Sequence, residues 1–226
     1  MANQLDLEEQ EQLDQLKHFW SQYGNLITGL LLLVLCAVAA WNAYHYWQRS
    51  QATQSAAMFD EMSKSVAAGD LAMAQRTFSD MKERYASATY TQQAALALAR
   101  QASDKGELEA AKAALQSVVD KSADEGYAAI ARLRLANLYF DAKDYAQALV
   151  MLDGVKDDAF AGLVADRKGD ILVVQAKRED AKAAYLLAYQ KLDERAQYRR
   201  VVQVKLNALG VDPEASAAST SAEVKK

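Results

Sequence analysis

Proline and glycine are scarce in this chain of 226 residues, which contains one proline, Pro213, and nine glycines. A β-sandwich or a β-barrel needs many turn-forming residues, so this scarcity favours long helices joined by short turns. Hydrophobic residues make up 51% of the chain and charged residues 25%, a composition that excludes disorder throughout. The sequence therefore predicts an all-α protein with a packed core.

Histidine and cysteine are absent from the whole chain after residue 50, because Cys36, His18 and His45 all precede it. This absence excludes Ser-His-Asp and Cys-His nucleophile systems, and His/Cys zinc sites, from that part of the chain. Carboxylate chemistry or a lysine nucleophile stays formally possible, but no such pair stands out. We expect a protein that is not an enzyme and that uses no cofactor or metal.

An excess of positive charge is also missing. The chain has 26 Lys and Arg residues against 30 Asp and Glu residues, a formal net charge of −4 at pH 7. Proteins that bind nucleic acid usually carry a basic surface, so this balance argues against nucleic acid as the main partner.

Charged residues are absent from a long stretch near the N-terminus, between Phe19 and Gln48. A helix needs about 20 apolar residues, rising about 1.5 Å each, to cross a bilayer. Aromatic residues flank the apolar run on both sides, as in the two aromatic belts of a spanning helix: Trp20, Tyr23, Trp41, Tyr44, Tyr46 and Trp47. The sequence predicts an acidic arm over residues 1–20 and a transmembrane helix over residues 21–48 that anchors the protein in the lipid bilayer.

Other interpretations of this stretch fit less well. A buried core helix is rarely so uniformly apolar at this length, and a cleaved signal peptide begins with a basic segment. Lipidation at Cys36 requires a small preceding residue, whereas Leu35 stands there. The orientation stays open on charge alone, because Lys17 before the helix and Arg49 after it nearly balance.

The remaining chain repeats a helical pattern. Four alanines are each followed four positions later by a large apolar residue: Ala74 with Phe78, Ala111 with Leu115, Ala148 with Leu152, and Ala181 with Tyr185. The alanines are 37, 37 and 33 residues apart, and a spacing of four places both members of a pair on one helix face. Twelve positions before three of these alanines stand the small residues Ala99, Ala136 and Gly169, whereas Met62 takes the first such place.

A period of this length is typical of the tetratricopeptide repeat, here without its usual Trp and closing Pro. We therefore predict a tetratricopeptide-like α-solenoid of about four degenerate helix pairs over residues 50–210. An unrelated alanine-rich bundle is the alternative. Residues 193–209 are expected to form a C-terminal capping helix, with one apolar side made of Tyr198, Val201, Val202, Leu206 and Leu209. Residues 211–226 lack apolar periodicity and are expected to be a disordered tail.

The order of these segments resembles the YfgM family, whose members are ancillary subunits of the bacterial SecYEG translocon. Local stretches carry the resemblance: LRLA at 133–136, VADRKGD at 164–170 and VKLNAL at 204–209. The resemblance implies a single-pass protein of the bacterial inner membrane, with its N-terminus in the cytoplasm and its repeats in the periplasm. It also implies association with the SecYEG translocon and the PpiD chaperone. The implied function is to help pass unfolded, translocating polypeptides to periplasmic chaperones.

A tetratricopeptide array presents a concave surface lined by the first helix of each pair. The residues that follow the small positions, Arg100, Asn137 and Asp170, are therefore candidate partner-binding residues, with Phe140 one turn away. Solvated charges and a core phenylalanine are the simpler interpretation of these residues. Two other functions stay open: an adaptor of opposite topology in cell division or stress signalling, and a hydrolase that uses two inward-facing carboxylates.

Overall fold

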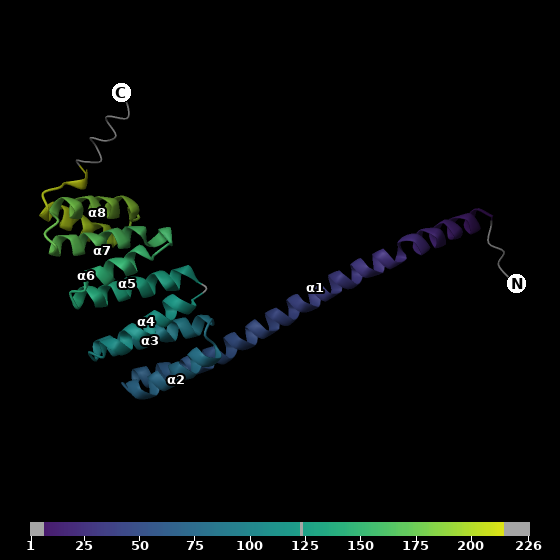
Figure 1. The fold of residues 1–226 in the computed structure, drawn as a ribbon, viewed down its shortest axis with the longest axis horizontal. Helices are drawn as coiled ribbons and strands as arrows, with labels where there is room; N and C mark the ends of the chain where they lie inside the picture. The colour runs from purple at the N-terminus through teal and green to yellow at the C-terminus, as the bar shows by residue number, and fades with distance from the viewer. Residues whose placement is uncertain (1–6, 123, 215–226) are drawn as a thin grey trace, which may run out of the picture. The chain divides into compact units, whose positions relative to one another are not determined.

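The computed structural model describes residues 7–122 and 124–214, and every regular element in that part of the chain is helical. The elements are α1 (Leu7–Ala67), α2 (Leu71–Arg84), α3 (Thr89–Asp104), α4 (Leu108–Lys121), α5 (Glu125–Asp141), α6 (Tyr145–Asp153), the short 3₁₀ helix η1 (Asp158–Phe160), α7 (Ala161–Val174), α8 (Arg178–Lys191) and α9 (Gln197–Ala208) (Figure 1). The prediction of an all-α fold is confirmed.

The chain divides into two compact units, residues 1–53 and residues 54–226. The described part of the first unit is entirely helical and belongs to α1, which includes a stretch long and apolar enough to cross a membrane. The predicted segment 21–48 is thus the middle of a longer helix. The arm predicted over 1–20 is helical from Leu7, and its first six residues lie outside the described part of the chain.

Polar side chains within the apolar part of α1 hydrogen-bond to the helix's own backbone. The Thr28 hydroxyl donates to the carbonyl of Gly24 at 2.7 Å, and the Asn42 amide donates to the carbonyl of Val38 at 3.0 Å. In hydrocarbon an unsatisfied polar group costs several kcal/mol, so these local bonds make both residues compatible with a membrane environment.

The second unit is a stack of helix pairs that contact one another in chain order. Residues 54–67 of α1 and helix α2 form the first pair, because Met62 of α1 and Ala74 of α2 belong to one apolar cluster. Helices α3–α4, α5–α6 and α7–α8 form the next three pairs. Helix α9 contacts α8 and closes the series. The predicted solenoid of about four pairs with a terminal cap is therefore confirmed.

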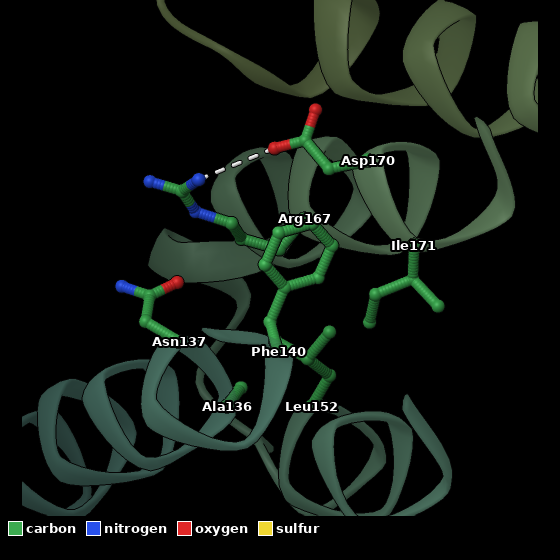
Figure 2. Close-up of a pocket in the computed structure, with 7 residues that line it drawn as sticks. All are labelled: Ala136, Asn137, Phe140, Leu152, Arg167, Asp170 and Ile171. Carbon is green, nitrogen blue, oxygen red and sulfur yellow. Dashed lines mark hydrogen bonds and ion pairs between the residues drawn. The ribbon is translucent and has the colours of Figure 1, made fainter. Parts of the chain in front are cut away.

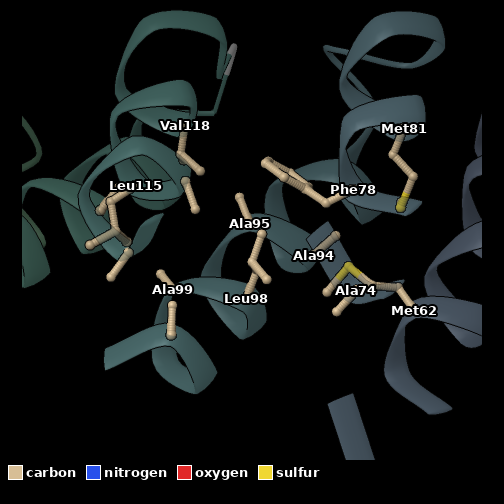
Figure 3. Close-up of a cluster of buried hydrophobic side chains, with 14 of the residues drawn as sticks. Met62, Ala74, Phe78, Met81, Ala94, Ala95, Leu98, Ala99, Leu115 and Val118 are labelled. Carbon is tan, nitrogen blue, oxygen red and sulfur yellow. The ribbon is translucent and has the colours of Figure 1, made fainter. Parts of the chain in front are cut away.

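The repeated small residues lie at the centre of these pairs. The four alanines of the repeat, Ala74, Ala111, Ala148 and Ala181, are completely buried, and the large residue four positions after each is buried with it. Figure 3 shows this arrangement for the first two repeats, where the Met62 side chain lies beside Ala74 in one apolar cluster. Met62 is fully buried, so a large flexible side chain fills the position that is small in the other repeats.

The glycine in the fourth repeat allows a close helix contact. A β-carbon added to Gly169 would overlap the ring of Tyr185 on α8. A side chain larger than hydrogen would therefore push α7 away from α8. This contact explains why a glycine stands where Ala99 and Ala136 stand in the two preceding repeats.

The C-terminal helix differs from its prediction in two respects. It begins at Gln197 rather than Asp193, because the Asp193 carboxylate accepts a hydrogen bond from the backbone of Arg195 and forms a turn instead. Val201 is 44% exposed, so its expected place on the buried side is wrong. The buried side is set by Val202 and Leu206, and Val201 lies one residue, or about 100°, away around the helix.

Residues at the start of the predicted tail are still packed. Val211 contacts the apolar cluster formed by α7, α8 and α9, and Pro213 is buried. The rest of the predicted tail, from residue 215, lies outside the described part of the chain.

The turns inside the helix pairs, and the turn after α9, share one backbone conformation. A residue with positive φ follows the first helix of every pair and α9, with φ values of 72° at Gly69, 78° at Gly106, 61° at Lys143, 59° at Ala176 and 80° at Gly210. The next backbone amide then bonds back to a carbonyl five residues earlier, as Asp70 does to Ser65 at 2.9 Å and Asp144 does to Tyr139 at 2.8 Å. These are Schellman caps, which favour glycine at the left-handed position.

Lys143 and Ala176 are therefore predicted sites of stabilisation by glycine. Replacing either one with glycine should raise the free energy of unfolding by about 0.5–1 kcal/mol, since a left-handed conformation strains a residue with a β-carbon. The measurement is urea unfolding of the full chain in detergent micelles, followed by helical circular dichroism. The matched control is Lys182→Gly inside α8, which should lower stability by about 1 kcal/mol. Equal losses in all three variants would contradict the cap assignment.

Candidate interaction surface

Three of the predicted partner-binding residues lie at equivalent positions on successive first helices. Arg100 on α3, Asn137 on α5 and Asp170 on α7 each follow the buried small residue of their repeat. The small residue faces the second helix of its pair, so the next residue is rotated by about 100° toward the edge of that contact. Arg100 is exposed, whereas Asn137 and Asp170 are half-buried.

A groove between α3 and α5 brings two of these residues together. Its volume is about 410 Å³, and both Arg100 and Asn137 line it. Arg134, which the sequence analysis did not single out, lines the same groove, and its guanidinium donates to the carbonyl of Leu96 at 3.0 Å. The groove has room for a few residues of an extended chain.

A second, much smaller pocket lies between α5, α6 and α7, where Asn137, Phe140 and Asp170 all contribute to the lining (Figure 2). Its volume is about 20 Å³, which is room for about one water molecule. Phe140 packs against the apolar cluster of this repeat and lies edge-on to Tyr145, with ring centroids 5.6 Å apart. The structure therefore gives Phe140 a packing role, and partner binding by it stays a prediction.

Asp170 belongs to a network of charged and phenolic groups at the C-terminal end of the stack. Its carboxylate accepts a hydrogen bond from the Tyr185 hydroxyl at 2.8 Å and from the Lys205 ammonium at 2.7 Å. Arg167 on the same helix adds an ion pair at 3.2 Å, which Figure 2 shows beside Phe140. Since both carboxylate oxygens are already engaged within the chain, Asp170 is poorly placed to bind a partner.

Asp166 forms the buried centre of this network. Its side chain is 0% exposed, and both of its oxygens accept bonds from Lys205, at 2.7 and 2.9 Å. The Tyr198 hydroxyl donates to the same carboxylate at 2.6 Å. Lys205 and Tyr198 both belong to α9, so these bonds attach the capping helix to α7. A charge buried without such partners would destabilise the fold.

The two tyrosines remain protonated at neutral pH. Burial raises the pKa of Tyr185, and its hydrogen bond to Asp170 raises that pKa further. Burial also raises the pKa of Tyr198, with an added contribution from its hydrogen bond to Asp166. Both hydroxyls therefore act as hydrogen-bond donors to the carboxylates under physiological conditions.

This arrangement does not have the geometry of a two-carboxylate hydrolytic site. The neighbouring carboxylates of Asp166 and Asp170 share the ammonium of Lys205, and the pocket beside Asp170 is only about 20 Å³. A hydrolase using two carboxylates needs a substrate-sized cavity between them. Within the described residues, no group of three or more His, Cys, Asp or Glu side chains is placed to hold a metal ion.

The sequence contains a signal for this network. Asp166 stands at the repeat position occupied by Leu96 and Leu133 in the two preceding repeats, so a charged residue interrupts an otherwise apolar column. A buried acid at such a position requires a cation, and Lys205 on the capping helix supplies it. The partner lies 39 residues away in the sequence, and only the packing of α9 on α7 and α8 identifies it.

The geometry defines a repeat protein whose stacked helix pairs form a groove and whose last helix is attached by buried charges. Comparison with known proteins agrees: the tetratricopeptide repeat-like domain matches residues 17–211. The chain therefore belongs to the tetratricopeptide repeat-like domain family. No solved structure matches the chain.

Curated relatives span nearly the whole length of the chain. Proteins named ancillary SecYEG translocon subunit from Escherichia coli (strain K12) and from Neisseria gonorrhoeae are each 28% identical to it, over 206 and 204 residues. The matches cover 90% of this chain in both cases, and 97% and 98% of the relatives. A relative of the same name from Haemophilus influenzae is 28% identical over 203 residues. The resemblance to the YfgM family is thus confirmed.

The network predicts a large effect for a single substitution on the capping helix. Lys205→Met should lower the free energy of unfolding by about 3 kcal/mol, because it leaves the carboxylates of Asp166 and Asp170 without their shared cation. Urea unfolding of the full chain in detergent measures this. The control is Lys182→Met, which removes an ion pair to the 81% exposed side chain of Glu179 and should cost at most about 0.5 kcal/mol. Equal costs would show that the network does not hold α9 in place.

Proposed function

We propose that this protein is a single-pass scaffold of the bacterial inner membrane that associates with the SecYEG translocon. In this proposal its repeats help pass translocated polypeptides to periplasmic chaperones, PpiD among them. The observation that carries the proposal is the match to relatives named ancillary SecYEG translocon subunit, which covers 90% of this chain and at least 97% of each relative.

The long helix α1 supports the membrane part of the proposal. Its apolar stretch has exposed side chains, and the polar Thr28 and Asn42 bond to their own helix. In hydrocarbon the polar side chains of such a helix keep their hydrogen bonds, whereas in water the helix would expose a large apolar surface. We propose that the anchor corresponds to residues 21–48, with the N-terminal arm in the cytoplasm and residues 50–210 in the periplasm.

The groove between α3 and α5 supports the scaffold part of the proposal. Arg100 and Asn137 line this groove, whose volume is about 410 Å³. An extended polypeptide fits an open groove of this kind better than a compact substrate does. Tethering the domain to the membrane near the translocon raises its effective concentration there, so modest individual contacts suffice.

Co-purification tests this function. The full chain, gently solubilised from membranes, should retain SecYEG and PpiD, because both recognise it in the bilayer environment. A variant in which residues 26–47 are replaced by an unrelated spanning helix should retain the same partners if the repeats carry the specificity. The domain released by starting the chain at Ser50 should fold but retain the partners poorly, because it has lost the tether.

Two results would contradict the proposal. Failure of the full chain to retain SecYEG would exclude association with the translocon. Equal retention by the released domain would show that tethering to the membrane does not contribute to partner retention.

A further inference from the structure

The groove between α3 and α5 is lined by charged residues of both signs that are separated into two zones. Asp104 and Asp141 are the last residues of α3 and α5 and form the acidic zone, whereas Arg100 and Arg134 stand earlier in the same helices and form the basic zone. Asn137 lines the same groove. All four charged residues are exposed. Within residues 7–122 and 124–214, none of the four takes part in an ion pair.

The two arginines come from neighbouring first helices and are close enough for their charges to interact. Desolvation lowers the pKa of the Arg134 guanidinium, and the positive charge of Arg100 lowers it further. Like charges held together without a carboxylate between them repel each other. An incoming carboxylate would relieve that repulsion and could accept hydrogen bonds from both guanidinium groups.

The two aspartates lie about one to two helical turns farther along the same helices. Asp104 follows Arg100 by four residues on α3, a rise of about 6 Å, and Asp141 follows Arg134 by seven residues on α5, a rise of about 10 Å. A spacing of four residues allows opposite charges on a helix to pair, yet Arg100 and Asp104 do not. Their side chains therefore remain available to a ligand.

We propose that this groove binds an extended polypeptide segment in which an acidic and a basic side chain stand two positions apart. The acidic side chain contacts Arg100 and Arg134, and the basic side chain contacts Asp104 and Asp141. Two residues of an extended chain span about 6.6 Å and point to the same face, which matches the helical rise between Arg100 and Asp104. This inference rests on the proposed function, in which the repeats hold polypeptides in extended form.

The charge zones also predict what the groove rejects. A segment with two acidic side chains at the same spacing would place its second carboxylate against the aspartates, and a segment with two basic side chains would place an ammonium against the arginines. Like charges brought together lower affinity, so both segments should bind more weakly than the mixed one.

The test measures binding of fluorescein-labelled ten-residue peptides to the full chain in detergent micelles by fluorescence anisotropy. The peptides share a Gly/Ser background and differ at two positions, which carry Glu and Lys, Glu and Glu, Lys and Lys, or Gln and Gln. The Glu/Lys peptide should bind about fivefold tighter than each of the other three, the gain expected from ion pairs near a protein surface.

Two variants with matched controls assign the preference to the groove. Arg100→Gln should remove the fivefold preference, whereas Arg76→Gln, at an exposed arginine on α2 outside the groove, should leave it intact. Asp104→Asn combined with Asp141→Asn should tighten binding of the Glu/Glu peptide. Asp80→Asn on α2 should not. None of these side chains is buried, so the variants are expected to keep their helical circular dichroism.

The proposal is overturned if the Glu/Glu peptide binds as tightly as the Glu/Lys peptide, if no peptide binds, or if Arg76→Gln has the same effect as Arg100→Gln. Retention of SecYEG by the same preparations separates this inference from the proposed function. If the unmutated chain shows no preference for the Glu/Lys peptide but still retains SecYEG, only the groove assignment is overturned. Loss of SecYEG from the unmutated chain contradicts the scaffold function itself.

Discussion

The close approach of paired helices at small buried residues is the constraint on which the rest of the structure depends. Ala111, Ala148 and Ala181 have no exposed surface, and Gly169 leaves no room for a β-carbon beside Tyr185. Because neighbouring helices meet at these positions, the distance between the helices and the rotation of each helix about its axis are fixed. On each first helix, the residue after the small position therefore reaches the surface at an equivalent point. The groove between α3 and α5 is therefore a consequence of core packing, since the same register that buries Ala99 and Ala136 presents Arg100 and Asn137.

The stack ends differently from the way it propagates. Within the repeats, apolar side chains hold successive helices together, but α9 is held partly by Lys205 and Tyr198 bonding to Asp166. Buried charge pairs add little net stability compared with apolar contacts, yet they tolerate few alternative arrangements, because an unpaired buried charge is costly. A repeat array needs a distinct end that does not recruit a further repeat. The polar network fixes the position of α9 on α7 more strictly than an apolar interface alone would.

Much of the fold could be predicted from the sequence because repeated packing leaves a repeated pattern. The Ala-to-large spacing located all four helix pairs, and the charge-free stretch located the apolar part of α1. Three features could not be predicted in this way. Lys143 and Ala176 are strained because they occupy the left-handed position that glycine occupies in the equivalent turns at Gly69, Gly106 and Gly210. The partner of Asp166 depends on a tertiary contact with Lys205. Arg134 stands one residue before Leu135, a core residue, so only the structure reveals that it lines the groove.

Site-specific photocrosslinking in living cells tests the central claim most directly. A photoreactive amino acid at Asn137, in the groove, is compared with one at Val150, an exposed residue on α6 that does not line it. Cells then express a secretory protein arrested during translocation through SecYEG. The account predicts a crosslink from position 137 to the arrested polypeptide and little or none from position 150. Equal crosslinking at both positions, or crosslinks from position 137 to cytoplasmic proteins alone, would contradict a membrane-anchored scaffold that receives translocating chains in its repeat groove.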